Sequence, residues 1–237
     1  KERTDVLLAV LINGMASHIY DFDDTYLETI HHPSGPVAPV IFALGEKYNL
    51  PGDQLIKAFI LGVETELRIS RALYPSHYDT GWHITATTGC FGSVVAASIL
   101  LDLTEEQMVH ALGIAGTQAA GLREVFGSMT KPFHPGKAAQ NGLLAALLAR
   151  DGFTSSPQLI EAEKGMANVM SDTPSLHKIN EQWGEIWEIR DNAFKPYACG
   201  IVLHPVIDAC IHLRNFVNID EIQTVELKVN PYVLEMT

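Results

Sequence analysis

A cluster of positive charge marks one short segment of the sequence as a candidate binding site. Residues 128–142 hold Lys131, His134 and Lys137 around a Pro-Gly pair, and an apolar helical pattern follows from residue 138. Proline and glycine interrupt helices, so we expect a turn that leads into a new helix N-terminus, where free N–H groups and the helix dipole attract anions. The net charge of the chain is −12, so a local gathering of cations is unusual. It predicts a site for a small anion such as a carboxylate.

Other turns carry side chains that could transfer protons. His32 lies in a turn before a proline, with His31 beside it as an alternative for the same role, and His83 directly precedes a predicted helix. Histidine titrates near neutral pH, which suits general acid–base catalysis. Taken singly, each of these histidines could equally be a packed structural residue.

An acidic cluster precedes the two adjacent histidines. Asp21, Asp23 and Asp24 follow a predicted helix, and three interpretations are open for them. They could cap the helix and form a turn, they could orient or assist an imidazole, or they could bind Mg²⁺.

A third group lies near the end of the chain. His204 is expected in the first turn of a helix, with Tyr197 and Cys199 a few residues before it. A Cys–His nucleophile pair is conceivable here. Cysteine is also a common small core residue, and we favour that interpretation of Cys199.

Composition narrows the class of protein. Hydrophobic residues make up 47 % of the 237 residues and charged residues only 19 %, which favours closely packed helices. The net charge of −12 argues against nucleic-acid binding, and no apolar run is long enough for a membrane span. The three cysteines form no CxxC pair, which indicates reduced thiols and a cytoplasmic location.

The hydrophobic periodicity predicts a mainly α fold in two parts. We expect a helical domain over 1–188, with Thr4 as an N-cap and a capping box at 104–107. Its main helices are predicted at 4–20, 37–48, 52–73, 87–101, 104–120 and 138–150. From 189 to 237 we expect the beginning of a smaller, incomplete α+β domain. Its elements are predicted as short strands at 187–190 and 222–229 around a helix at 201–216.

Taken in order along the chain, these segments resemble the MmgE/PrpD family. The resemblance rests on short motifs that are weak singly and strong together. They are Asn13-Gly-Met-Ala-Ser-His18, Asp21-Phe-Asp-Asp-Thr25, His32-Pro-Ser34, Gly81-Trp-His83-Ile-Thr85, Gly121-Leu122, Gly127-Ser-Met-Thr-Lys-Pro132, His134-Pro-Gly136, Ala138-Ala139 and the stretch from Lys195 to Pro205.

The resemblance implies a fold and a chemistry. The family includes 2-methylcitrate dehydratase, cis-aconitate decarboxylase and iminodisuccinate epimerase, and the DFDDT text is closer to the decarboxylase and epimerase branch. Its members are metal-independent homodimers with a helical domain and a smaller lid domain. The likeness also implies helices before residue 1 and more of the lid after residue 237. The residues that match the decarboxylase branch's functional positions are Asp21, Thr25, His32, His83, Lys131 and His204.

The hypothesis is therefore a cofactor-independent lyase or isomerase that transfers protons next to a carboxylate of a small di- or tricarboxylate. Lys131 is expected to bind that carboxylate, assisted by His134, Lys137 and Tyr197, while His83 and His32 transfer protons. Two alternatives remain open. One is an inactive helical scaffold or dimer partner, and the other is an Mg²⁺-dependent enzyme that uses the three aspartates.

Overall fold

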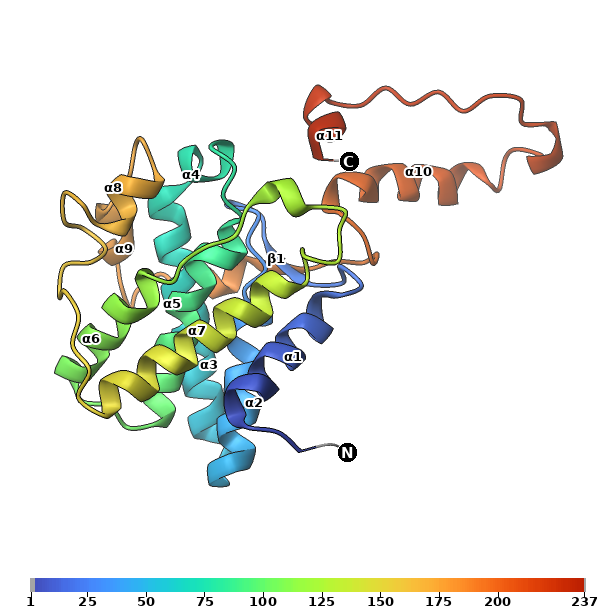
Figure 1. Ribbon diagram of the computed structural model, residues 1–237. Coiled ribbons are helices and arrows are strands. Elements are labelled where there is room, and N and C mark those ends of the chain that lie inside the picture. The colour runs from blue at the N-terminus through green and yellow to red at the C-terminus, as the bar shows by residue number, and fades with distance from the viewer. Residues whose placement is uncertain (1–2, 237) are drawn as a thin grey trace.

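The computed structural model describes residues 3–236 and confirms a mainly α fold (Figure 1). The longer helices are α1 (Val6–His18), α2 (Ser34–Tyr48), α3 (Gly52–Leu73), α5 (Ile84–Leu100), α6 (Glu105–Gly116), α7 (Phe133–Arg150) and α10 (His204–Leu213). Short helices are α4 (Ser76–Asp79), α8 (Met166–Met170), α9 (His177–Asn180) and α11 (Pro231–Met236). Four 3₁₀ turns connect them, namely η1 (Arg123–Val125), η2 (Glu188–Asp191), η3 (Ile201–Leu203) and η4 (Ile219–Glu221). Within the described residues, no helix has both the length and the apolar character needed to cross a bilayer.

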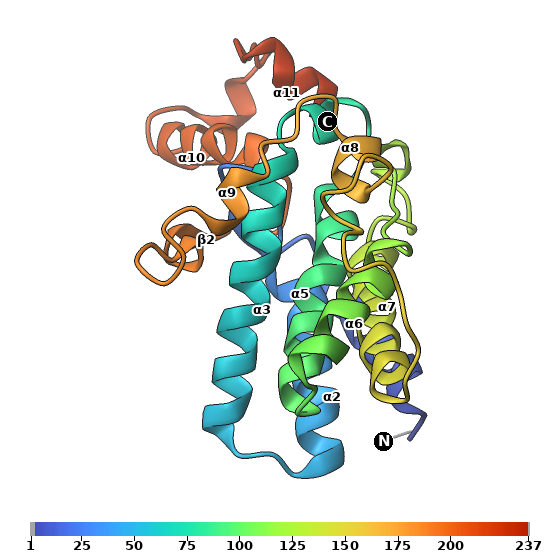
Figure 2. The same cartoon turned by 90° about the vertical axis from the view of Figure 1, so that its left-hand side faces the viewer.

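The centre of the fold is α5. Apart from Ile99, every residue of this helix is buried, and Figure 2 shows it between α3 on one side and α6 and α7 on the other. Small residues permit this close packing. A Cβ on Gly89 would lie 2.5 Å from Cγ of Pro36 in α2, and one on Gly142 of α7 would lie 2.4 Å from Cβ of Ser93. Since these positions have no room for a side chain, the helix axes approach closely.

Helix α7 begins earlier than the sequence indicates. Pro135 and Gly136 lie in its first turn rather than in a preceding loop, so the predicted start near residue 138 is wrong. Proline is tolerated there because the first N–H groups of a helix have no intrahelical partner. Gly136 is required by packing against α1, since a Cβ on it would lie only 2.3 Å from the carbonyl oxygen of Leu11. Other helix starts agree more closely. The capping box at Thr104 is confirmed, while Asp5 rather than Thr4 caps α1.

The β structure is smaller than predicted and lies elsewhere. β1 (Asp24–Tyr26) pairs antiparallel with β2 (Asn192–Phe194), which ties the acidic cluster to the later part of the chain. The segment 187–190 is largely the 3₁₀ turn η2, and 222–229 forms no strand, so both predicted strands are wrong. An alternating segment needs a neighbouring strand to complete its hydrogen bonds, and none of the described strands pairs with it.

Figure 1 shows α10 and α11 projecting from the helical body. The division of the chain at residue 188 stays a prediction.

Two buried glutamates on α3 have opposite environments. The Glu64 carboxylate accepts from Nε of fully buried Arg68 at 2.7 Å, and from the backbone N–H groups of Glu188 and Ile189. By contrast, both carboxyl oxygens of Glu66 lack a hydrogen-bond partner in the described part of the chain, and burial raises its pKa well above 4.5. Glu64 therefore acts as a charged anchor, whereas Glu66 is buried as the neutral acid.

We expect the two glutamates to respond differently to amide substitution. Glu64→Gln leaves the Arg68 guanidinium without its counter-ion and lowers the free energy of unfolding by about 3 kcal/mol. Glu66→Gln changes it by less than about 1 kcal/mol near pH 5. Folded Glu66 keeps its proton well above pH 4.5, whereas the unfolded chain releases it near that pH. As the pH rises, the wild-type protein therefore loses about 1.4 kcal/mol of unfolding free energy per pH unit until folded Glu66 also releases its proton. The Glu66→Gln variant shows no such loss. Urea unfolding of both variants at about pH 5 and about pH 8 measures this. Equal costs for the two variants would contradict the assignment.

Candidate active site

A small cavity of about 60 Å³ lies where four loop segments meet at one end of the helical body. Its lining comes from the segment between α1 and α2, the loop between α4 and α5, the loop before α7 and the segment after β2, together with Tyr78 of α4. The lining residues are Asp21, Ile30, His32, Tyr78, His83, Phe126, Lys131, Lys195, Gly200, Ile201 and Val202. Four residues proposed from the sequence therefore share one cavity, namely Asp21, His32, His83 and Lys131.

Two ammonium groups converge on one carboxylate in the cavity wall. Nζ of Lys131 lies 2.6 Å from Oδ1 of Asp21, and Nζ of Lys195 lies 3.1 Å from the same oxygen. Lys195 also donates to the backbone carbonyl of Asp21, at 3.0 Å. Burial acts to raise the pKa of Asp21, but the hydrogen bond and charge of Lys131, together with those of Lys195, lower it overall. The site thus contains a fixed anion between two cations.

The hydrogen bonds of His32 define which of its ring nitrogens carries the proton. Its Nδ1 lies 2.9 Å from the carbonyl oxygen of Asp24 and 3.1 Å from Oγ1 of Thr25. A carbonyl can only accept, so Nδ1 carries the proton and Nε2 retains its lone pair. Burial, and then the charge of Lys195, lower the pKa of His32 to about 4. The ring is therefore neutral at neutral pH, with a lone pair that can accept a proton. Thr25 contacts the ring at Nδ1 and is not part of the cavity lining.

The structure distinguishes the two adjacent histidines. His31 is fully buried behind His32, with Nδ1 3.3 Å from Oγ1 of Thr88 and Nε2 3.8 Å from Glu66. It lies outside the cavity lining, so His32 is the better candidate for acid–base chemistry.

His83 caps α5 and pairs with another histidine. Its backbone N–H donates to the carbonyl of Gly121, and its Nδ1 lies 2.7 Å from Nδ1 of His134 in the first turn of α7. The edge of Phe126 meets the His83 ring, with the ring centroids 4.9 Å apart. Burial, and then the charges of His134 and other neighbours, lower the pKa of His83 well below 6.5. His134 therefore contacts the lining residue His83 and is not itself part of the cavity lining.

Two residues of the site were missed as candidates from the sequence. Lys195 precedes a proline, as Lys131 does, and this shared context was the available signal. His18 lies in the last turn of α1, is buried, and has Nδ1 2.6 Å from Oδ1 of Asp23. Its ring centroid lies 5.5 Å from that of His32 and 6.4 Å from that of His83. Only its spacing from Asp21 and Asp23 at the end of a helix could have indicated it.

The acidic cluster does not converge on a common point. Oxygens of Asp24 accept from Ser34 and Asn192, away from the two other aspartates. Ligand atoms of His18, Asp21 and Asp23 do lie within 4.8 Å of one another. However, Asp21 is already bonded to two ammonium groups and Asp23 to His18. A divalent cation would have to displace those partners, so this donor set does not fit a resident metal ion.

Three other predicted residues lie outside the cavity lining. Tyr197 donates its hydroxyl to Asp208, and Nζ of Lys137 donates to Gln140 on the same helix. His204 begins α10, two residues after the lining segment 200–202, and its Nε2 lies 3.3 Å from the carbonyl oxygen of Cys199. His204 is therefore adjacent to the cavity, while the other two side chains are bound elsewhere.

Two residues of the cavity lining have strained backbone conformations. Asp21 and Ile30 both have left-handed conformations, with φ of 51° and 58°. Aspartate tolerates this region, but for a β-branched residue such as Ile30 it is unusual and costs about 1–3 kcal/mol. The paired backbone of Tyr26 and His31 encloses Ile30 and holds it in place. Such strain is typical of a segment whose geometry is set by function.

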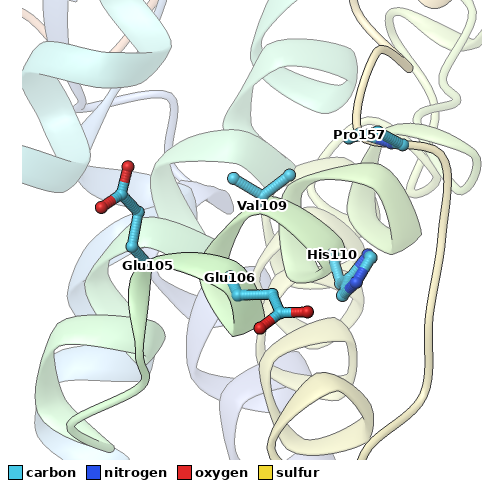
Figure 3. Close-up of a pocket in the computed structure, with 5 residues that line it drawn as sticks. All are labelled: Glu105, Glu106, Val109, His110 and Pro157. Atoms are coloured by element: carbon cyan, nitrogen blue, oxygen red, sulfur yellow. The ribbon is translucent and has the colours of Figure 1, made fainter.

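A second, larger hollow of about 530 Å³ lies on the outer side of α6 (Figure 3). The carboxylates of Glu105 and Glu106 point away from each other in this view. His110 is bonded through Nδ1 to the backbone of Ser155. No polar groups converge there, so this hollow lacks the features of a catalytic site.

The chain is similar in sequence to characterised enzymes. It is 32 % identical over 212 residues to cis-aconitate decarboxylase of Homo sapiens, which covers 87 % of this chain and 44 % of that protein. The corresponding enzyme of Aspergillus terreus is 31 % identical over 220 residues, covering 87 % and 45 %. The Mus musculus enzyme is 32 % identical over 218 residues, covering 87 % and 43 %. The chain thus spans under half the length of these relatives.

A family model covers most of the sequence. Residues 1–178 match the MmgE/PrpD N-terminal domain, a range that includes the buried helices and all of the cavity except Lys195 and 200–202. The resemblance found in the motifs is confirmed, and the chain belongs to the MmgE/PrpD family.

Proposed function

We propose that this chain supplies the active site of a cofactor-independent lyase that acts on a small di- or tricarboxylate by proton transfer next to a carboxylate. One observation carries the proposal: Lys131 and Lys195 meet at Asp21 in the wall of a cavity that His32 and His83 also line. Two cations and two neutral imidazoles are the groups that this chemistry needs.

The charges and free lone pairs of the lining residues suggest a role for each of them. When a bond next to a carboxylate breaks, negative charge develops on an enolate-like group, and the ammonium groups of Lys131 and Lys195 stabilise it. His32 offers a lone pair on Nε2, and His83 can use only Nε2 because His134 occupies its Nδ1. Asp21 holds the two lysines in place by ion pairs until a substrate carboxylate competes for them.

The relatives suggest which reaction to test first. Those named above are cis-aconitate decarboxylases, so decarboxylation of cis-aconitate is our first candidate. Dehydration and epimerisation next to a carboxylate place similar demands on the site. Assembly as a homodimer and a cytoplasmic location stay predictions from the sequence.

Substrate entry requires movement of the outer wall. The cavity of about 60 Å³ is smaller than a six-carbon acid. Gly200 is free of close neighbours around its Cβ position, and residues 200–202 form one side of the cavity. We infer that this segment shifts when the substrate binds, and that the nearby His204 shifts with it.

The first test is an activity assay on the complete natural protein that contains this sequence. Cis-aconitate, 2-methylcitrate and iminodisuccinate are supplied separately, each with and without excess chelator. We expect turnover of one of these acids, unchanged by the chelator, because lysines rather than a metal ion neutralise Asp21. No turnover of any of them would refute the proposed function, and loss of activity in chelator would revive the Mg²⁺ alternative.

A second test addresses the cation that binds the carboxylate. Lys131→Ala is expected to lower kcat/KM by about 10²-fold or more, because a charge that stabilises the transition state is lost. Asp21 keeps Lys195 as a partner, so the variant should fold. Lys57→Ala, which removes an exposed lysine of α3, serves as the control. Near wild-type rates for Lys131→Ala would contradict the assignment.

A third test uses the pH dependence of the base. Protonation of His32 removes its lone pair, so activity should be lost as the pH falls through its pKa. The acid limb of kcat/KM is expected near the pKa of about 4 rather than near 6.5. His32→Asn can retain the bond to the Asp24 carbonyl but has no base, and should lower kcat by about 10²-fold or more. An acid limb near 6.5, with the fold intact by circular dichroism, would show that another group is the base.

A further inference from the structure

The contact between His83 and His134 constrains where protons can be. Their Nδ1 atoms are 2.7 Å apart in the buried interior, and this contact joins the start of α5 to the first turn of α7. Burial lowers the pKa of His83 well below 6.5 and that of His134 to about 4, so both rings are neutral at neutral pH. A neutral imidazole has one N–H group, and a hydrogen bond between two Nδ1 atoms needs one proton between them. The two rings must therefore be opposite tautomers.

This arrangement differs from that of a structural histidine. His77 is also buried, with a pKa lowered to about 4, but its Nδ1 is bonded to the carbonyl oxygen of Met170 and its Nε2 to Oγ1 of Thr87. A carbonyl only accepts, so His77 is fixed as one tautomer. The partner of His83 can both donate and accept, and the proton between the two rings can move without breaking the contact.

The two rings differ in their relation to the cavity. His83 is 2 % exposed and borders the cavity, whereas His134 is 6 % exposed and is not part of its lining. Gly121, with φ of 149°, packs along the edge of the His134 ring, and a Cβ there would lie 3.3 Å from Nε2. Nε2 of His134 is not among the fully buried side-chain atoms that lack a partner, so the pair leads from the cavity to an atom that keeps some contact with solvent.

We propose that His134 is a positioning residue that forms, with His83, a two-imidazole proton relay between the cavity and solvent. The proposal rests on the proposed function and extends it. With His32 as the base, the Nε2 proton of His83 passes to the carbanion, the Nδ1 proton of His134 passes to Nδ1 of His83, and Nε2 of His134 takes up a proton from solvent. One proton enters and one leaves, so neither ring becomes charged. The reverse transfers return both rings to their starting tautomers.

Imidazole NMR on protein labelled with ¹⁵N-histidine tests the shared proton without any need for activity. We expect the population of His83 with its proton on Nε2 to equal the population of His134 with its proton on Nδ1, since one proton determines both. His77 provides an internal reference fixed in the Nδ1–H form. Finding His83 and His134 in the same tautomer would overturn the relay, whatever the enzyme assays give.

Kinetics on the active protein test the relay itself. His134→Gln can still hydrogen-bond to His83 but cannot pass a proton on, so kcat should fall by about 10-fold or more with KM little changed. His134→Ala should regain part of its kcat when imidazole is added. His77→Ala, the matched buried histidine, should show no such rescue. Wild-type kcat for His134→Gln would overturn the relay while leaving the proposed function standing.

Discussion

The contact of one carboxylate with two ammonium groups determines the geometry of the whole site. Asp21 follows α1, Lys131 precedes α7, and Lys195 follows β2, so three distant segments meet at a single side chain. Two lysines could not approach so closely without an anion between them. The pairing of β1 with β2 reinforces the junction, because it places Lys195 next to the acidic segment. The carboxylate of Asp21 thus occupies the position of charge that a substrate carboxylate would take.

Burial, together with the same cations, explains how several histidines can share a small space. The ring centroid of His18 lies 5.5 Å from that of His32 and 6.4 Å from that of His83, and the ring centroids of His83 and His134 are 5.0 Å apart, so a charge on each would be strongly repulsive. Burial and the nearby lysines favour the neutral form of His32, His83 and His134. Neutral rings can donate and accept at once, and their individual partners then decide their roles. A carbonyl fixes the tautomer of His32, with the lone pair on Nε2, while a second imidazole leaves the tautomer of His83 free to change.

The sequence was sufficient for part of this description. Helical periodicity and capping residues predicted most helices. The order of the motifs predicted that Asp21, His32, His83 and Lys131 belong to one site. It could not reveal contacts that depend on tertiary packing. Gly136 belongs inside α7 because Gly14 of α1 packs on it, and no local pattern records that. The alternation over 222–229 is a real strand signal, but a strand requires a neighbour. Lys137 carries the same charge as Lys131, yet it lies inside α7, where its ammonium group donates to Gln140.

The burial of α5 on almost all sides limits where in this fold substitutions can be tolerated. Nearly every side chain of this helix is in the core, and several of its contacts leave no room for one more carbon atom. Substitutions there are expected to cost folding stability, because a well-packed core tolerates neither added nor removed volume. Segments at the cavity wall, such as 200–202, have fewer such contacts and can change with less cost to the fold. The shape of the cavity can therefore vary while the helical framework stays the same.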